Sequence, residues 1–313
     1  MAKSLNPQQQ AALKYIDGPL LVLAGAGSGK TSVITQKIAY LVEECGIPAR
    51  NIAAVTFTNK AAREMKARVA SLLSGADGRG LTVSTFHNLG LNIIRSEIKA
   101  LGFKPGFSIL DQEDCRNLLK ELLSRNSELD EKLIDTAQNT ISNWKNGLLE
   151  PHQVASASAS NSEQATAMLY ERYQRALKAY NAVDFDDLIM TPVLLFRNKP
   201  EVLDKWKRRI RYLLVDEYQD TNLAQYELVR TLVNDKQALT VVGDDDQSIY
   251  AWRGARPENL MQLQTDFPTL NIIKLEQNYR STGRILKAAN TLIANNPPLI
   301  SKELWSELGP GDP

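Results

Sequence analysis

The chain has 313 residues with 37 Lys and Arg against 36 Asp and Glu, which gives a formal net charge of +1. Its 43% hydrophobic and 23% charged residues exclude global disorder, and its two cysteines exclude a disulfide framework. Apolar runs fall short of the roughly 20 residues of a membrane span, and near-neutrality excludes a generally polycationic nucleic-acid binder. We therefore expect a cytoplasmic protein of two domains that does not enter a membrane and that contacts any DNA or RNA through a local groove.

Short apolar runs at several points of the chain predict buried strands, and a helical pattern follows each of them. Strands that alternate with helices predict an α/β fold with a parallel sheet covered on both faces. The runs are Leu20–Ala24, Ile52–Phe57, Leu81–Ser84, Tyr212–Val215 and Leu239–Val242.

The stretch from about residue 88 to residue 182 has a different pattern, with amphipathic helical segments and no convincing strand. We expect a helical subdomain inserted into the α/β domain, in which the low-complexity run Ala155–Ser160 is an exposed connector. A further unit is expected beyond Leu275, with a helix from about Gly283 to Ala294. The expected helices of the insertion are Leu91–Ala100, Gln112–Leu123, Leu133–Leu148 and Ala165–Ala179.

A glycine-rich segment lies between the first expected strand and the amphipathic helix that follows it. Backbone N–H groups and the positive end of the helix dipole can cradle phosphates at such a turn. Lys30 would reach the β- and γ-phosphates, and the Thr31 hydroxyl would bind Mg²⁺. A glycine-rich turn with a chance Lys-Thr pair is the alternative. The strict pattern has Gly at the first position of this segment, which reads Ala24, Gly25, Ala26, Gly27, Ser28, Gly29, Lys30, Thr31.

Two acidic residues follow the expected strand Tyr212–Val215. Asp216 would hold Mg²⁺, directly or through water, and Glu217 would orient and deprotonate an attacking water. A solvated acidic turn is the alternative, and the phosphate loop makes it the less favoured one. A further acidic run, residues 183–188, is interpreted as a helix N-terminus in preference to a metal site.

Three consecutive carboxylates, Asp244–Asp246, follow the last of these expected strands and form either a solvated loop or another metal cluster. The neutral amide of Gln247 can hydrogen-bond a γ-phosphate or its attacking water without adding negative charge. In the next loop, exposed Tyr250, Trp252 and Arg253 can stack on unpaired bases and clamp them. The alternative is that the two aromatic rings pack in the core.

Several short motifs follow one another along the chain. They are LNPQQ at 5–9, AGAGSGKT at 24–31, AVTFTNKAAREM at 54–65, STFH at 84–87, VDEYQD at 215–220, VVGDDDQSIYAWRGA at 241–255 and LEQNYRS at 275–281. In kind and order this set resembles the UvrD/Rep/PcrA-type superfamily 1 DNA helicases over nearly the whole chain. The resemblance implies a RecA-like P-loop NTPase domain at 1–87 and 191–276, an inserted helical subdomain at 88–190, and the beginning of a second RecA-like domain at 277–313. The family's later motifs lie further along that second domain.

The resemblance also implies roles for individual residues. Gln9 would read the edge of adenine, Tyr279 would stack on the base, and Arg280 would meet the γ-phosphate. At the position of Ser32 the family often has an arginine that packs on adenine, so base affinity or base choice is expected to differ. Phe57 would otherwise be a core residue at a strand end, and His87 a helix cap. The residues expected to contact single-stranded DNA are Phe57, Asn59, Lys60, Thr85, Phe86, His87, Tyr250, Trp252 and Arg253.

As a whole, the resemblance implies a DNA helicase or translocase that hydrolyses ATP with Mg²⁺, moves 3′ to 5′ along single-stranded DNA, and acts in replication or repair. Expected partners are single-stranded DNA, junctions with duplex DNA, and replication-restart or repair proteins, with the chain a monomer or weak dimer. A nucleotide- and DNA-binding module without a productive motor is the main alternative, and a P-loop kinase or GTPase of the same fold is a third. The catalytic residues would be Glu217, Asp216, Lys30, Gln247 and Arg280.

Overall fold

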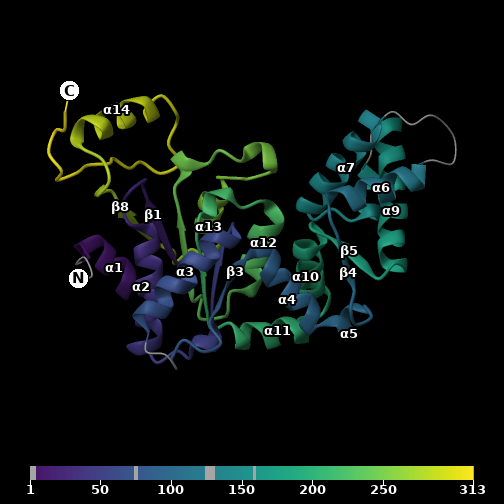
Figure 1. Ribbon diagram of the computed structural model, residues 1–313, viewed down its shortest axis with the longest axis horizontal. Coiled ribbons are helices and arrows are strands. Elements are labelled where there is room, and N and C mark those ends of the chain that lie inside the picture. The colour runs from purple at the N-terminus through teal and green to yellow at the C-terminus, as the bar shows by residue number, and fades with distance from the viewer. Residues whose placement is uncertain (1–4, 74–76, 124–130, 158–159, 313) are drawn as a thin grey trace. The chain divides into compact units, whose positions relative to one another are not determined.

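The structure is a computed structural model that describes residues 5–73, 77–123, 131–157 and 160–312. The chain divides into two compact units (Figure 1). The first, here called the sheet unit, comprises residues 1–85, 203–221 and 232–313. The second, the helical unit, comprises residues 86–202 and 222–231.

A parallel six-stranded sheet of order β3-β2-β6-β7-β1-β8 forms the centre of the sheet unit. The predicted α/β fold and each of the predicted strands are confirmed, with ends shifted by one residue at most. A sixth strand, β8, lies at the edge beside β1 and was not predicted. The strands are β1 Leu20–Ala24, β2 Ile52–Thr56, β3 Thr82–Thr85, β6 Tyr212–Val215, β7 Leu239–Gly243 and β8 Asn271–Leu275.

Both faces of the central strands are buried, as their continuous apolar runs predicted. Alternate residues, such as Leu20 and Val22 of β1, pack with apolar residues of the helices α2 and α3 in one core cluster. The intervening residues, such as Leu21 and Leu23, are equally buried on the other face. The helices of this unit are α1 Pro7–Lys14, α2 Lys30–Glu43, α3 Asn59–Leu72, α13 Asn259–Asp266 and α14 Gly283–Ile293, and α11 Pro200–Arg209 begins at its boundary with the helical unit.

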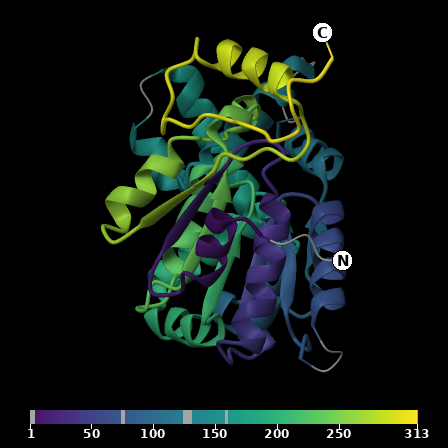
Figure 2. The same ribbon diagram turned by 90° about the vertical axis from the view of Figure 1, so that its left-hand side faces the viewer.

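The C-terminal segment lies across the end of the sheet where the strands finish, and it is drawn in yellow in Figure 2. The helix α14 confirms the helix expected from about Gly283. Backbone hydrogen bonds tie this segment to the sheet and to the loop after β1: Gly25 N–H donates to Leu275 O (3.3 Å), and Tyr279 N–H donates to Gly27 O (3.0 Å).

The helical unit contains one short parallel strand pair, β4 with β5, in addition to its helices. The expectation of no strand in this stretch was therefore wrong, because three-residue strands are too short to show a hydrophobic period. Ala155–Ala157 of the expected connector is the end of a helix, while residues 158–159 lie outside the described residues. The elements are α4 Phe86–Ser96, α5 Ile98–Leu101, β4 Ser108–Leu110, α6 Gln112–Leu123, α7 Glu131–Asn146, α8 Pro151–Ala157, α9 Asn161–Ala179, β5 Ala182–Asp184, α10 Asp187–Asn198 and α12 Leu223–Leu232.

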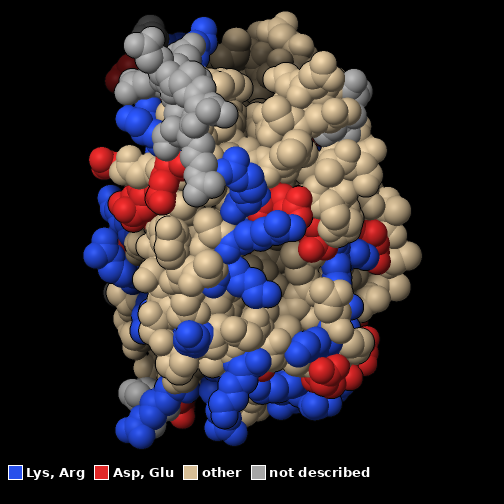
Figure 3. Space-filling view, turned by 90° about the vertical axis from the view of Figure 1, so that its right-hand side faces the viewer, with Lys and Arg blue, Asp and Glu red and all other residues tan. Residues whose placement is uncertain are grey.

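A buried ion cluster joins α7 to the start of α10 in this unit. The Lys145 ammonium lies 2.6 Å from the Asp184 carboxylate and 2.9 Å from that of Asp187. The helix α10 begins at Asp187, which confirms the interpretation of the acidic run as a helix N-terminus. Figure 3, which faces the side of the molecule with α6, α7 and α9, shows Lys and Arg interspersed with Asp and Glu on a largely uncharged surface.

Among the described residues, no helix is both long enough and apolar enough to cross a membrane. Cys45 and Cys115 are both free thiols.

Candidate active site

Three loops that carry all of the predicted catalytic residues except Arg280 leave adjacent strands at one edge of the sheet. The strands β6, β7 and β1 are neighbours and run parallel, so their carboxyl ends meet at this edge. Ligands of open α/β sheets bind at such an edge because the loops there converge on one crevice.

The loop after β1 has the backbone geometry of an anion cradle. Gly27 and Gly29 adopt positive φ angles of 72° and 87°, which glycine tolerates without strain. Gly29 is the N-cap of α2 and offers no side-chain cap, so the N–H groups of the first helical turn need acceptors from elsewhere. A Cβ on Gly27 would lie 2.6 Å from Asn278 Nδ2, so a side chain there would collide with the segment after β8. The loop therefore fits a phosphate group.

Lys30, the first residue of α2, points to the loop after β6. Its ammonium lies 3.3 Å from Glu217 Oε2, and Gln219 Nε2 donates to the same oxygen at 2.9 Å. Glu217 has a positive φ of 51°, a conformation that costs free energy in a non-glycine residue and that clusters at functional sites. A bound phosphate would compete with Glu217 for Lys30 and release its carboxylate.

Asp216 directly follows β6, with its side chain nearly out of contact with solvent. Burial, reinforced by the charge of Glu217, raises the pKa of Asp216 to about 6, although the charge of Lys30 opposes this shift. Its Oδ1 accepts the Glu217 N–H at 2.9 Å. The Asp216 carboxylate and the Thr31 hydroxyl, on the first turn of α2, are oxygen donors of the kind that Mg²⁺ takes, and their role as its ligands stays a prediction.

The loop after β7 is connected to Glu217 through Gln219, a residue of the VDEYQD motif for which no role was predicted. Gln219 Oε1 accepts the Asp244 N–H at 2.9 Å, while Gln219 Nε2 bonds Glu217. The predicted phosphate sensor Gln247 donates to the Asp244 carboxylate. The two amides therefore link the loops that would orient the attacking water and contact the γ-phosphate.

The acidic loop Asp244–Asp246 is only partly solvated, because Asp244 and the Asp245 side chain are buried while Asp246 is exposed. Its oxygens are close enough together for a metal ion, but the Lys302 ammonium lies among them. This lysine lies more than fifty residues further along the chain, and no local motif marks it.

The residues expected to hold adenine are connected to one another beside the phosphate loop. Gln9 Nε2 donates to Ser28 O at 2.9 Å, and its Oε1 accepts the Asn6 N–H at 3.0 Å. Asn6 Nδ2 in turn donates to the Tyr279 hydroxyl at 2.8 Å. Arg280 is exposed next to this group and makes no ion pair with any described residue. Their roles toward a nucleotide, like the effect of Ser32, stay predictions.

The loop after Gln247 carries an exposed aromatic group. Trp252 is 74% exposed and Tyr250 is 38% exposed, so the alternative that both rings pack in the core is wrong. The Arg253 guanidinium lies 4.5 Å from the centre of the Trp252 ring and 5.2 Å from that of Tyr250. Exposed rings next to a cation are suited to stacking on bases.

The other residues predicted to contact DNA differ in exposure. Asn59 and Lys60 are exposed on the first turn of α3, and Phe57 just before it is half-buried. Thr85 is buried at the end of β3, and Phe86 is only 1% exposed. His87 packs edge-on to the Phe185 ring at 6.1 Å, and burial lowers its pKa.

Comparison with known proteins gives a consistent result. The family described as the UvrD/REP helicase N-terminal domain matches residues 5–268. The chain is 59% identical to the ATP-dependent DNA helicase Rep of Escherichia coli over 98% of this chain and 46% of that protein. It is 49% identical to the ATP-dependent DNA helicase PcrA of Bacillus subtilis over 98% of this chain and 42% of that protein. The chain thus spans about half the length of the relatives it matches.

Proposed function

This chain belongs to the UvrD/REP helicase family, and we propose that it is an ATP-dependent motor that moves along single-stranded DNA. The observation that carries the proposal is a continuous chain of contacts within the sheet unit. It runs from Lys30 through Glu217, Gln219 and Asp244 to Gln247, and the exposed rings follow three and five residues later in the sequence.

In this proposal the phosphate loop binds the triphosphate of ATP, and Gln9 and Tyr279 bind the base. Thr31 and Asp216 would hold Mg²⁺, which lowers the charge repulsion at the phosphates. Lys30 stabilises the β- and γ-phosphates, and Glu217 then accepts a proton from the attacking water. Arg280, free of ion pairs among the described residues, would stabilise the charge that develops on the γ-phosphate.

The coupling to DNA would pass through Gln247. Bases would stack on Trp252 and Tyr250, with a second contact area at Phe57, Asn59 and Lys60. A change in the contact between Gln247 and the γ-phosphate would move the loop that holds the bases, because Gln247, Tyr250 and Trp252 lie on one short segment. From the family resemblance we propose movement in the 3′ to 5′ direction and unwinding of duplex DNA.

The same resemblance supports a role in DNA replication or repair, in the cytoplasm, with single-stranded DNA and its duplex junctions as substrates. It supports replication-restart or repair proteins as partners of a monomer or weak dimer. It also supports a RecA-like domain formed by residues 1–87 and 191–276, with 88–190 inserted and a second RecA-like domain beginning at 277–313.

A second candidate is a module that binds nucleotide and DNA without productive turnover. This chain spans 46% of the Escherichia coli relative, so the activity of this stretch by itself is what separates the two candidates.

The two candidates differ in the ATP hydrolysis rate of this chain with and without a single-stranded oligonucleotide. Strong stimulation by DNA, together with strand separation of a tailed duplex, supports the motor. Binding of both ligands without turnover supports the module, and absence of ATP binding contradicts both.

A further inference from the structure

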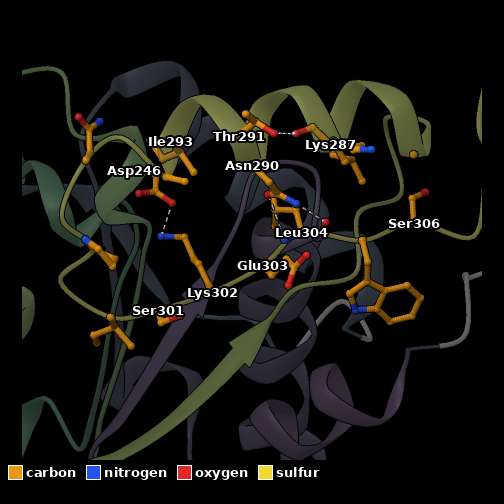
Figure 4. Close-up of a pocket in the computed structure, with 17 residues that line it drawn as sticks. Asp246, Lys287, Asn290, Thr291, Ile293, Ser301, Lys302, Glu303, Leu304 and Ser306 are labelled. Atoms are coloured by element: carbon orange, nitrogen blue, oxygen red, sulfur yellow. Dashed lines mark hydrogen bonds and ion pairs between the residues drawn. The ribbon is translucent and has the colours of Figure 1, made fainter. Parts of the chain in front are cut away.

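Lys302 lies on the segment after α14 and reaches the acidic loop that precedes Gln247. Its ammonium is 2.9 Å from Asp244 Oδ1, 2.5 Å from Asp245 Oδ1 and 2.7 Å from Asp246 Oδ2. Figure 4 shows Lys302 extending from the segment after α14 toward Asp246, at one end of the hollow that α14 borders. The Lys302 side chain is only 4% exposed, and those of Asp244 and Asp245 are 3% and 6% exposed, so its contacts with these two carboxylates are buried.

This acidic loop depends on a cation at that place. Three adjacent carboxylates repel one another, and buried carboxylates are costly unless they are paired. Burial of Lys302 disfavours its charged form, but the hydrogen bonds and charges of the three aspartates prevail and raise its pKa. The lysine therefore stays protonated and holds the carboxylates in one arrangement.

The arrangement reaches the hydrolytic residues through Asp244. The same carboxylate that meets Lys302 accepts a hydrogen bond from the Gln247 amide. The Asp244 N–H bonds Gln219, whose amide bonds the Glu217 carboxylate. One aspartate thus connects Lys302 with the predicted γ-phosphate sensor on one side and the predicted general base on the other.

The segment that carries Lys302 is itself fixed to the sheet. Leu299 N–H donates to Asp245 Oδ2 at 3.2 Å, and Trp305 N–H donates to Glu276 O at 3.0 Å. A Cβ on Gly25 would overlap the Leu304 side chain, so the same segment also packs against the phosphate loop. A shift of this segment would therefore move both the acidic loop and the phosphate loop.

We propose that Lys302 is a positioning residue that sets the Gln247 and Gln219 amides, and hence the Glu217 carboxylate, according to the position of the segment after α14. This inference rests on the proposed function for its consequence in catalysis, although its structural part does not. Lys302 touches no reacting group in this account and acts only through Asp244.

The structural part is tested by the side-chain amide signals of ¹⁵N-labelled glutamines in Lys302→Met. The signals of Gln247 and Gln219 are expected to shift, while that of Gln9, whose amide bonds Ser28 O, stays in place. Lys287→Met is the matched control, because Lys287 is an exposed lysine that borders the same hollow and makes no ion pair with a described residue. Unmoved Gln247 and Gln219 signals would overturn the proposal, whether or not the chain hydrolyses ATP.

The catalytic consequence is tested by steady-state ATP hydrolysis with single-stranded DNA. Replacing a group that orients a catalytic residue typically costs roughly 10- to 100-fold in activity, so kcat should fall by that factor in Lys302→Met. The KM for ATP should change by no more than about threefold, since the groups that bind the nucleotide are kept. Lys302→Arg, which keeps the charge, should recover part of the loss, and an unchanged kcat in the methionine variant would contradict the inference.

Two further results keep the interpretation clear. An inactive unmodified chain would count against the proposed function. The amide signals would then decide whether Lys302 positions Gln247 and Gln219. Should Lys302→Met fail to fold, Lys302→Met with Asp245→Asn restores the net charge of the acidic loop while keeping the Asp244 link. The Gln247 and Gln219 amide signals of that double variant should shift in the same way. Signals at the chemical shifts of the unmodified chain would overturn the proposal.

Discussion

Replacing Trp252 by alanine isolates the contribution of base stacking to DNA binding. The ring is 74% exposed and lies 4.5 Å from the Arg253 guanidinium, so it is available to a base and contributes little to the core. Stacking of one base on an aromatic ring is worth about 1–3 kcal/mol, which corresponds to a rise in Kd of roughly 5- to 150-fold. The free energy of unfolding should stay within about 0.5 kcal/mol, because an exposed side chain is removed.

The assay is fluorescence anisotropy of a labelled oligothymidylate at several salt concentrations. The slope of log Kd against log salt should be unchanged, because a tryptophan neutralises no phosphate. Trp305→Ala is the matched control, a second tryptophan of the sheet unit with a 48% exposed ring outside the predicted DNA contacts. The reasoning is refuted if Trp252→Ala binds DNA as tightly as the unmodified chain, or if both variants weaken binding equally.

Three other predictions follow from buried charges. Lys145→Met should destabilise the helical unit by about 3–5 kcal/mol in urea unfolding, because Asp184 and Asp187 lose their buried cation, and adding Asp187→Asn should restore part of that loss. Lys37→Met should lower the free energy of unfolding by about 1–3 kcal/mol, since it leaves without a donor the buried carbonyls at the end of α1 that the Lys37 amino group now bonds, including that of Ala12 at 2.8 Å. Burial raises the pKa of Asp216 to about 6, so the carboxyl becomes protonated below that pH. The apparent Mg²⁺ affinity, measured by calorimetry, should then fall about tenfold per pH unit. Asp216→Asn should lack this pH dependence.

The strands that could be predicted are those buried on both faces. β1 and β6 have continuous apolar sequences because they have neighbours on both sides and helices above and below. β8 lies at the edge with β1 as its one neighbour, is mostly only partly buried, and contains the polar residues Asn271 and Lys274. Its apolar run is too short to predict a strand, so the sequence instead predicts a new unit just beyond Leu275.

The parts of the candidate site that could be predicted are local in sequence. The phosphate loop is specified by consecutive residues, since a strand, a glycine-rich turn and a helix must follow one another. The contacts of Lys302 with Asp244 and of Gln219 with Asp244 join segments that are distant in the chain and meet only because β6 and β7 are adjacent and the segment after α14 folds back. No periodicity or motif records such contacts. From the sequence, the acidic loop could only be interpreted as a solvated loop or a metal cluster. In the structure the Lys302 ammonium lies among its carboxylates.

The central claim is that Glu217 activates the water that attacks ATP, and one comparison tests it most directly. Single-turnover hydrolysis and nucleotide binding would be measured with Glu217→Gln and with the unmodified chain in the presence of single-stranded DNA. The amide keeps the size of the side chain and loses its ability to accept a proton, so hydrolysis should be lost while ATP binding is kept. Undiminished turnover in Glu217→Gln would contradict the account.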